Sequence, residues 1–443
     1  MLVHALSSCA SWSRGYRWYN GWRIFSYLPS SSESYGHCTL SLSNPLWYLN
    51  MKSKLWQTTS PLDSLIEKFT VGDDYIVDKA FLRYDIEASR AHAKMLAKIG
   101  VITDDELKMA LTGFDEILDK HEKGEFNIDP SQEDSHTAIE WYLTEKFGDV
   151  GKKIHTGRSR NDQSLTMIRL FLKENFEESL LLISDCIGAF QSRMSEPPLV
   201  MPWYTHWQKA MPTTTHMWLQ SFYDALCDVE WVLAWLRRVF DQSPLWSAAG
   251  FWIESFPNDR AYSASLMGFS RVQENPMYCG LSRWLFEYEL LSQLGSVLLI
   301  ISRFNTDILL FTTSEFWYIS LPDTMTTGSS IMPQKRNYDV CELVRAKISV
   351  YFGYVDQIRN IYTHLMSGYQ RDLQMTKSLL LNAINIWSDI VEVSTLVVSS
   401  LQFHQQSLEK SLTHDLYATN EVYKLVAEGT PFRDAYKSIK WKL

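Results

Sequence analysis

Glycine is scarce in this sequence, and two features of common nucleotide-binding folds are missing. The chain has 19 glycines in 443 residues, about 4%, against a usual ~7%. It contains no glycine-rich phosphate loop and no alternation of strand-like and helix-like segments. A doubly wound α/β sheet is built from both, so this fold class is excluded.

Excess positive charge, paired cysteines and long apolar runs are missing as well. The formal net charge is -9, whereas binding to nucleic acid needs a basic face, so no nucleic-acid partner is expected. The six cysteines form no CxxC pair and no metal-ligand spacing, which predicts reduced thiols in a cytoplasmic protein without a metal. Apolar runs such as residues 294–301 are too short to cross a bilayer, so no membrane partner is expected.

Proline is absent from residues 131–196 and 334–430. These stretches are rich in Leu, Glu, Lys and Met, which favours long helices. Apolar residues recur in steps of four and three, typical of a helix along a bundle seam, at Leu290, Leu294, Val297, Ile301, Phe304, Ile308 and Phe311. Similar helices are expected over residues 164–194, 213–240, 339–365 and 377–401. The predicted fold is all-α, a long-helix bundle with smaller helical end domains.

The chain divides into four parts by composition and predicted helices. Residues 1–50 hold four Trp and three Arg but no Lys and one acid, Glu33. Two interpretations are open, an organelle transit peptide or an upstream segment foreign to the protein, since Met51 reads as a fresh start. An N-terminal helical domain is expected over residues 51–162, a central bundle carrying the signature loop over 163–402, and a short, truncated C-terminal helical region over 403–443.

A first polar segment, residues 155–163, precedes a predicted helix and reads HTGRSRNDQ. Its backbone N–H groups, two arginines and an amide would suit a carboxylate-bearing ligand. The alternative is an ordinary solvated helix cap.

A second segment, residues 201–212, carries His206 between flanking prolines. A histidine can act as an acid or a base near neutral pH, and the prolines would stiffen its loop. A lone histidine is more often structural, so this segment alone decides nothing.

A third segment, residues 327–337, combines two serines, two cations and an amide. A serine can act as a base only if its alkoxide is stabilised, and Lys335 together with a helix N-terminus supplies positive potential. The alternative is an ordinary serine-rich loop.

Together these segments resemble a known family. Residues 328–337 match GSSxMPxKxN at every fixed position, a signature shared by fumarases, aspartases, adenylosuccinate lyases and argininosuccinate lyases. HTGRSRNDQ and the YTHxQxAxP pattern of residues 204–212 resemble argininosuccinate lyases and not their relatives. Further matches lie at residues 133–136, 273–279 and 367–374, and the likeness runs from about Lys54 to about Tyr436. The chain is therefore identified as a member of the argininosuccinate lyase branch of the aspartase/fumarase superfamily.

The resemblance implies a reversible β-elimination of argininosuccinate to arginine and fumarate, as in arginine biosynthesis, with no cofactor and no metal. Ser329 would take the proton beside a carboxylate, and Lys335 and Asn337 would stabilise the resulting aci-carboxylate. His206, oriented by Glu342, would supply or organise the acid for the leaving nitrogen. The resemblance also implies which residues bind the substrate: Ser159, Arg160, Asn161 and Thr205 would bind the succinyl carboxylates, Tyr369, Gln374 and Lys377 would bind the amino-acid end, and His136 would line the pocket.

Members of this family are homotetramers whose active sites each draw on three subunits, which implies self-association here. Two alternatives remain. An adenylosuccinate lyase must hold a purine nucleotide, and HTGRSRNDQ argues against it. A catalytically silent relative like the lens crystallins is opposed by the intact Ser329, Lys335, Asn337 and His206.

Five tryptophans stand where the family usually has glycine: Trp203, Trp246, Trp252, Trp284 and Trp317. Glycine at such positions permits positive φ or a close backbone approach, and an indole provides neither. Converting roughly a dozen of the 17 tryptophans to glycine would restore the usual glycine content. The hypothesis is that UGA codons meaning glycine are translated here as tryptophan; the alternative is a genuinely tryptophan-rich variant.

Overall fold

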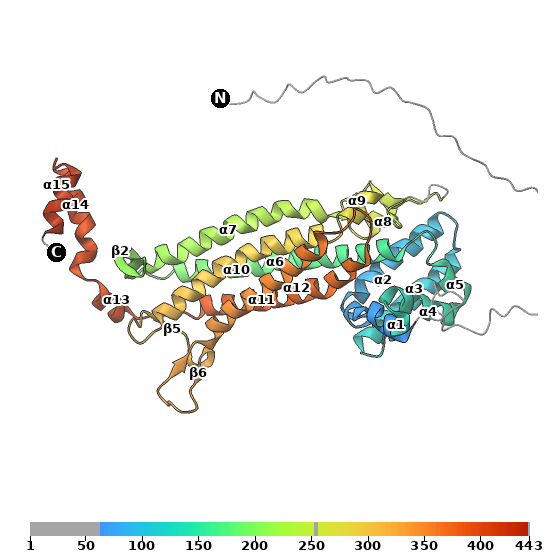
Figure 1. The fold of residues 1–443 in the computed structure, drawn as a ribbon, viewed down its shortest axis with the longest axis horizontal. Helices are drawn as coiled ribbons and strands as arrows, with labels where there is room; N and C mark the ends of the chain where they lie inside the picture. The colour runs from blue at the N-terminus through green and yellow to red at the C-terminus, as the bar shows by residue number, and fades with distance from the viewer. Residues whose placement is uncertain (1–62, 252–255, 442–443) are drawn as a thin grey trace, which may run out of the picture. The chain divides into compact units, whose positions relative to one another are not determined.

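The structure is a computed structural model that describes residues 63–251 and 256–441. Five long helices form a bundle (Figure 1), in which α6 packs against α7 and α12, and α10 packs against α7 and α11. The five are α6 (Arg160–Met194), α7 (Thr215–Phe240), α10 (Leu285–Phe311), α11 (Asp339–Tyr362) and α12 (Thr376–Ser399). The prediction of an all-α long-helix bundle is confirmed.

The predicted seam of α10 is the centre of this bundle. All seven of its positions, from Leu290 to Phe311, are buried, none more than 2% exposed. Each such side chain contributes about 1.5–3 kcal/mol when removed from water, so burial of this seam stabilises the bundle by roughly 10–20 kcal/mol before the entropy cost of folding.

Two of the bundle helices, over Leu285–Phe311 and Arg371–Ser399, are long and apolar enough by length and hydropathy to span a membrane. The length of the uninterrupted apolar runs had predicted no such helix. The two measures differ because isolated polar residues such as Asn305 break the runs but leave the mean hydropathy high. Core helices of water-soluble proteins pass the same test, and both helices pack here against other bundle helices. These helices are therefore weak evidence for a membrane span.

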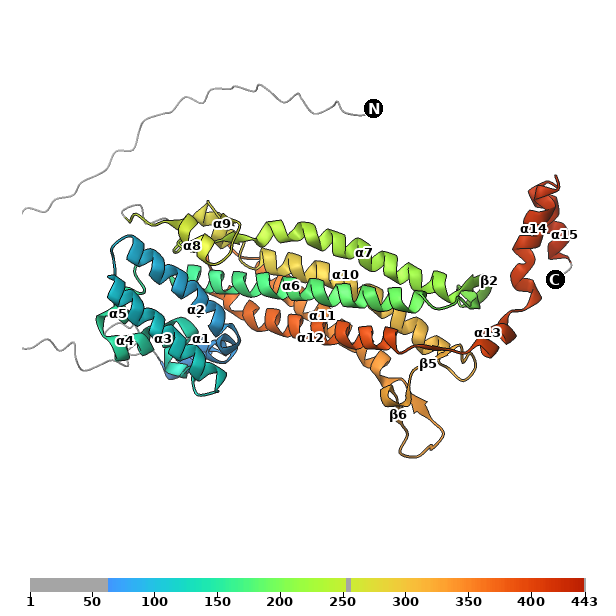
Figure 2. The ribbon, with the colours of Figure 1, turned by 180° about the vertical axis from the view of Figure 1, so that it is seen from behind.

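Shorter helices precede the bundle and pack on one end of it (Figure 2), where α2 contacts α3, α4 and α6. They are α1 (Ser64–Val71), α2 (Asp74–Lys98), α3 (Asp104–Glu122), η2 (Pro130–Gln132), α4 (Ser135–Phe147) and α5 (Asp149–Lys153). Thr103 begins α3 with a capping box, in which its side chain and that of Glu106 each accept from the other's backbone N–H.

Further short helices connect and follow the bundle. They are α8 (Arg260–Leu266), α9 (Pro276–Leu281), η3 (Asp323–Met325), η4 (Arg371–Met375), α13 (Gln405–Ser411), η5 (His414–Tyr417), α14 (Ala418–Ala427) and α15 (Phe432–Lys440). The last two build a small core of their own from Val422, Ala435 and Ile439. The described residues belong to one compact unit, and the finer domain limits stay predictions.

Strands occur among the described residues only as four two-stranded sheets. The pairs are β1 (Val200–Thr205) with β2 (Gln208–Thr214), β3 (Gln242–Ser243) with β4 (Arg271–Val272), β5 (Ile319–Ser320) with β8 (Gln402–Phe403), and β6 (Thr327–Gly328) with β7 (Arg336–Asn337). The expectation of a loop over residues 201–212 was wrong, because this segment is the antiparallel hairpin β1–β2.

Candidate active site

The HTGRSRNDQ segment ends as the first turn of α6, which begins at Arg160 rather than at the predicted residue 164. Ser159 caps the helix: its Oγ accepts from the Asn161 N–H at 3.2 Å, and Asp162 Oδ1 accepts from the Ser159 N–H at 2.7 Å. This places Arg160 and Asn161 at a helix N-terminus, where the backbone favours an anion. Arg160 is oriented by Glu133 at 2.9 Å and Asp134 at 3.4 Å.

The predicted residues for the amino-acid end meet the start of α2. Lys377 Nζ lies 2.6 Å from Asp78 Oδ1 and 3.0 Å from Asp74 Oδ1. Burial alone would lower the pKa of Lys377, but the two carboxylates outweigh it and raise the pKa, so Lys377 is charged. Gln374 donates to the backbone carbonyl of Val71 at 3.0 Å, which ties η4 to the end of α1.

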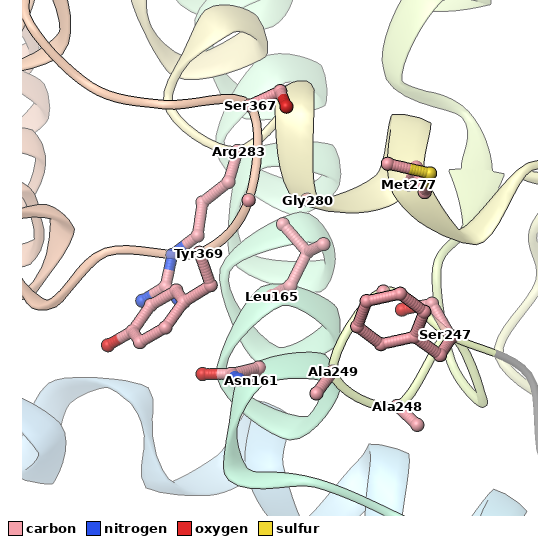
Figure 3. Close-up of a pocket in the computed structure, with 13 residues that line it drawn as sticks. Asn161, Leu165, Ser247, Ala248, Ala249, Met277, Gly280, Arg283, Ser367 and Tyr369 are labelled. Carbon is pink, nitrogen blue, oxygen red and sulfur yellow. The ribbon is translucent and has the colours of Figure 1, made fainter. Parts of the chain in front are cut away.

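Arg160 and Asn161 at the start of α6, together with Gln374 and Lys377, line one open pocket of about 720 Å³. Segments far apart in sequence bring together six residues predicted to bind substrate: His136, Arg160, Asn161, Tyr369, Gln374 and Lys377. An adjoining pocket (Figure 3) shares Asn161, Arg283 and Tyr369 with it. The shape and the mixed charges suit a ligand that carries several carboxylates and a cation.

This neighbourhood also contains residues that were not predicted as site residues. Asp74 and Arg283 line the pocket, and the buried Asp78 holds Lys377 beside it. Asp74 and Asp78 could have been found from their i, i+4 spacing, which places them on one face of a helix. Arg283 carries no sequence signal for a site, since only the fold brings it to Tyr369.

His136 is held from behind by a buried carboxylate. Its Nδ1 lies 2.6 Å from Asp85 Oδ2, which also accepts from the Ser135 hydroxyl at 2.6 Å. Because Nδ1 faces Asp85 while the residue lines the pocket, Nε2 is the nitrogen left for a ligand.

The predicted acid, His206, lies at the tip of the hairpin β1–β2. Thr205 pairs with Gln208, so His206 and Trp207 form a two-residue turn, with φ of 52° and 63°. Two positive φ values are the mark of a type I′ turn. Thr205 and His206 are exposed.

The predicted base, Ser329, lies in the connection between β6 and β7. Its Oγ accepts from the backbone N–H groups of Ile331 at 3.3 Å and Met332 at 3.1 Å. Two such donors stabilise negative charge on the oxygen, as a serine base requires. Asn337 donates to Thr327 Oγ1 at 3.4 Å within the same hairpin, and Lys335 is exposed.

Within one chain the predicted residues form three groups that lie apart: the pocket residues at the start of α6, the turn with Thr205 and His206, and the hairpin with Ser329. Arg160 opens α6 and His206 follows its end, and a helix of 35 residues is roughly 50 Å long. Glu342 lies in the first turn of α11, whereas Tyr369 follows the other end of this helix, whose 24 residues are roughly 36 Å long. Within residues 63–251 and 256–441, no hydrogen bond or ion pair joins His206 to Glu342 or Ser329 to the pocket.

No group of three or more His, Cys, Asp or Glu side chains that could hold a metal ion occurs in the described part of the chain. The predicted site residues are carboxylate, amide, hydroxyl and cationic groups from separate segments, and these bind organic anions and ammonium groups.

Comparison with known proteins decides the family. A family model described as lyase matches residues 57–353. The argininosuccinate lyase of Thermotoga neapolitana is 40% identical over 395 residues, covering 88% of this chain and 98% of that protein. The argininosuccinate lyase of Xylella fastidiosa (strain Temecula1) is 40% identical over 389 residues, covering 87% of each. The chain belongs to the argininosuccinate lyase family.

Solved structures of other lyases share the fold of this argininosuccinate lyase family member. EDDS lyase in complex with formate has a TM-score of 0.73 at 23% identity, covering 86% of this chain and 76% of that one. The class II fumarase of Schistosoma mansoni has a TM-score of 0.68 at 14% identity, covering 84% and 91%. At these identities the likeness concerns the fold alone.

Proposed function

We propose that this protein catalyses the reversible β-elimination of argininosuccinate to arginine and fumarate. The observation that carries the proposal is the pocket at the start of α6, where Arg160, Asn161 and Lys377 stand together. A helix N-terminus with an arginine complements the succinyl carboxylates, and the acidic residues around Lys377 complement an amino-acid end.

In the proposed reaction, Ser329 Oγ takes the proton from the carbon beside a carboxylate. The electron pair passes into that carboxylate as an aci-form, which Lys335 and Asn337 stabilise. The pair then forms the carbon–carbon double bond of fumarate as the carbon–nitrogen bond breaks. His206, oriented by Glu342, supplies or organises the proton for the leaving guanidino nitrogen. This nitrogen therefore leaves with a proton in place of the broken bond to carbon, and arginine is released.

We further propose that the active enzyme is a homotetramer, with each site assembled from three subunits. The helix lengths that separate the three groups within one chain support this, since copies packed side by side can bring them together. Exposed apolar side chains on the bundle helices supply the surface: Trp231 and Trp235 on α7, Leu299 on α10, Leu343 and Val350 on α11, and Leu396 on α12.

The test is a comparison of substrates on the purified chain. Argininosuccinate should yield fumarate and arginine in equal amounts, and adenylosuccinate should yield no fumarate. Fumarate from adenylosuccinate alone would assign the chain to the other lyase activity. Fumarate from neither substrate, in a folded chain, would favour the crystallin-like alternative.

A further inference from the structure

Arg283 is a buried cation that forms no direct ion pair among the described residues. It is only 4% exposed and lines both the substrate pocket and the adjoining pocket. One of its guanidinium nitrogens donates to Ser164 Oγ at 3.1 Å, its Nε has no partner, and no ion pair involves it among the residues described. A buried charge of this kind is costly unless an anion completes it.

The guanidinium of Arg283 is held in place by Tyr369. Its central carbon lies 4.8 Å from the centre of the Tyr369 ring, and the two side chains lie together in Figure 3. The acidic Glu287, in the first turn of α10, is buried, and the charge of Arg169 acts on it more strongly than that of Arg283. Arg283 is thus fixed in orientation and left free to bind an anion in the pocket.

Asp74 presents the opposite charge. It shares Lys377 with Asp78, so two carboxylates meet one ammonium, and Asp78 is the closer and the fully buried one. Burial is the main cause that raises the pKa of Asp74 to about 6; Lys377 opposes it, and Asp78 and Asp134 add to it. A second ammonium group would balance these charges.

We propose that the pocket recognises the amino-acid end of its ligand as a zwitterion, with Arg283 binding the α-carboxylate and Asp74 binding the α-ammonium. This rests on the proposed function for the identity of the ligand. Neither residue belongs to a signature motif, and together they specify an intact α-amino acid rather than any guanidine.

The experiment measures equilibrium binding by calorimetry, without turnover. The ligands are arginine, agmatine, which lacks the carboxylate, and 5-guanidinopentanoate, which lacks the α-ammonium. The unchanged protein should bind arginine about ten- to a hundredfold more tightly than either analogue. Equal affinity for all three would overturn the proposal, whatever the variants do.

Two variants assign the contacts. Arg283→Gln should bind arginine and agmatine equally while still rejecting 5-guanidinopentanoate, and Asp74→Asn should do the reverse. Arg271→Gln and Asp73→Asn are matched controls that keep the full preference, because both residues are exposed and neither lines the pocket. If Arg283→Gln keeps its preference for arginine over agmatine, the assignment is wrong. Loss of fumarate release with intact discrimination would instead overturn the proposed reaction.

A second inference rests on backbone conformation. Three of the five tryptophans predicted at glycine positions have left-handed φ values: 69° at Trp246, 69° at Trp284 and 48° at Trp317. Trp246 is the third residue of a turn closed by the Ser247 N–H to the Pro244 carbonyl at 3.1 Å, a place that calls for glycine. Trp203 lacks a positive φ, and Trp252 lies outside the described residues.

The two buried indoles of this group are also crowded. The Trp284 ring centre lies 3.0 Å from that of Tyr362, below the roughly 3.5–4.0 Å preferred between carbon atoms. Trp246 is 3% exposed, its Nε1 has no partner, and its ring fills the space where a Cβ on Gly157 would lie. Trp207 also has a left-handed φ, but it is 74% exposed and lies at a variable position of its motif, so neither crowding nor the motif calls for glycine there.

We infer that glycine occupies positions 246, 284 and 317 in the native polypeptide, encoded by UGA. Peptide mass spectrometry of the protein from its source, with the codons at these positions, tests this directly. UGG codons or tryptophan-containing peptides would overturn it. The triple variant Trp246→Gly, Trp284→Gly, Trp317→Gly should have a higher thermal midpoint than the chain as written. The control Trp231→Gly should have a lower one, because Trp231 is exposed within α7 and glycine weakens a helix.

Discussion

The Nδ1 atom of His136 lies 2.6 Å from Oδ2 of Asp85, and both side chains are buried beside the substrate pocket. Burial by itself would raise the pKa of Asp85 and lower that of His136. The attraction of the two charges and their hydrogen bond outweigh burial, so the pKa of Asp85 is lowered and that of His136 is raised. The pair is therefore an ion pair in the folded protein.

The stabilisation from this pair depends on pH. The contribution of Asp85 is present above its unfolded pKa of about 3.9 and is lost as the pH falls through the lowered value. The contribution of His136 is present below its unfolded pKa of about 6.5 and is lost as the pH rises through the raised value. Both are in force between about pH 4 and 6.5.

Asp85→Asn should therefore lower the free energy of unfolding by about 3–5 kcal/mol at pH 5, as expected for breaking a buried pair. The loss should be smaller above pH 8. Urea unfolding at both pH values measures it. Asp115→Asn, in an exposed pair with Arg90, is the control and should change little. A loss for Asp85→Asn that does not vary with pH would contradict the charge assignment.

Lys377 and Asp78 should behave as one unit. Lys377→Met leaves the fully buried Asp78 without its nearest cation and should cost about 3–5 kcal/mol of unfolding free energy. The double variant with Asp78→Asn should recover part of that loss, because no buried charge is then left alone. Denaturant unfolding of the four proteins measures the coupling, and strictly additive losses would refute it.

His206→Asn separates chemistry from structure. Asparagine tolerates the positive φ of this turn, so the thermal midpoint should stay the same. Removal of the acid should lower kcat by about 10²–10⁴-fold. Steady-state kinetics with argininosuccinate measures this, and an unchanged kcat would remove His206 from the mechanism.

The three-subunit site predicts rescue between inactive variants. Ser329→Ala and Arg160→Gln affect groups from different parts of the chain, so mixed oligomers of the two should regain some sites with both residues intact. Ser329→Ala mixed with Asn337→Ala should gain nothing, because both residues belong to one hairpin. Fumarate release after joint refolding is the readout. If native mass spectrometry shows mixed oligomers without rescue, the shared site is wrong.

The sequence predicted the bundle well because its signal is local. The spacing from Leu290 to Phe311 reports which face of α10 is buried, whatever it packs against. The start of α6 was placed too late because Arg160 and Asn161 are polar, and a polar first turn looks like a loop. The hairpin β1–β2 was missed because its turn, His206-Trp207, has none of the residues that favour a type I′ turn.

The motifs predicted residues that the fold brings together in one pocket, and their roles stay predictions. The pocket holds six of the residues transferred from the motifs, yet Arg283 came only with the fold, since its partner Tyr369 is far away in the sequence. In the proposed homotetramer, contacts between copies would set the distances between Ser329, His206 and the pocket, and no local pattern in the sequence encodes such contacts.

Fumarate release from argininosuccinate by the purified chain, with Ser329→Ala beside it, tests the central claim most directly. The unchanged chain should release fumarate and arginine in equal amounts, and Ser329→Ala should release none above background while keeping the same thermal midpoint and arginine affinity. Equal rates from the two proteins would contradict the account.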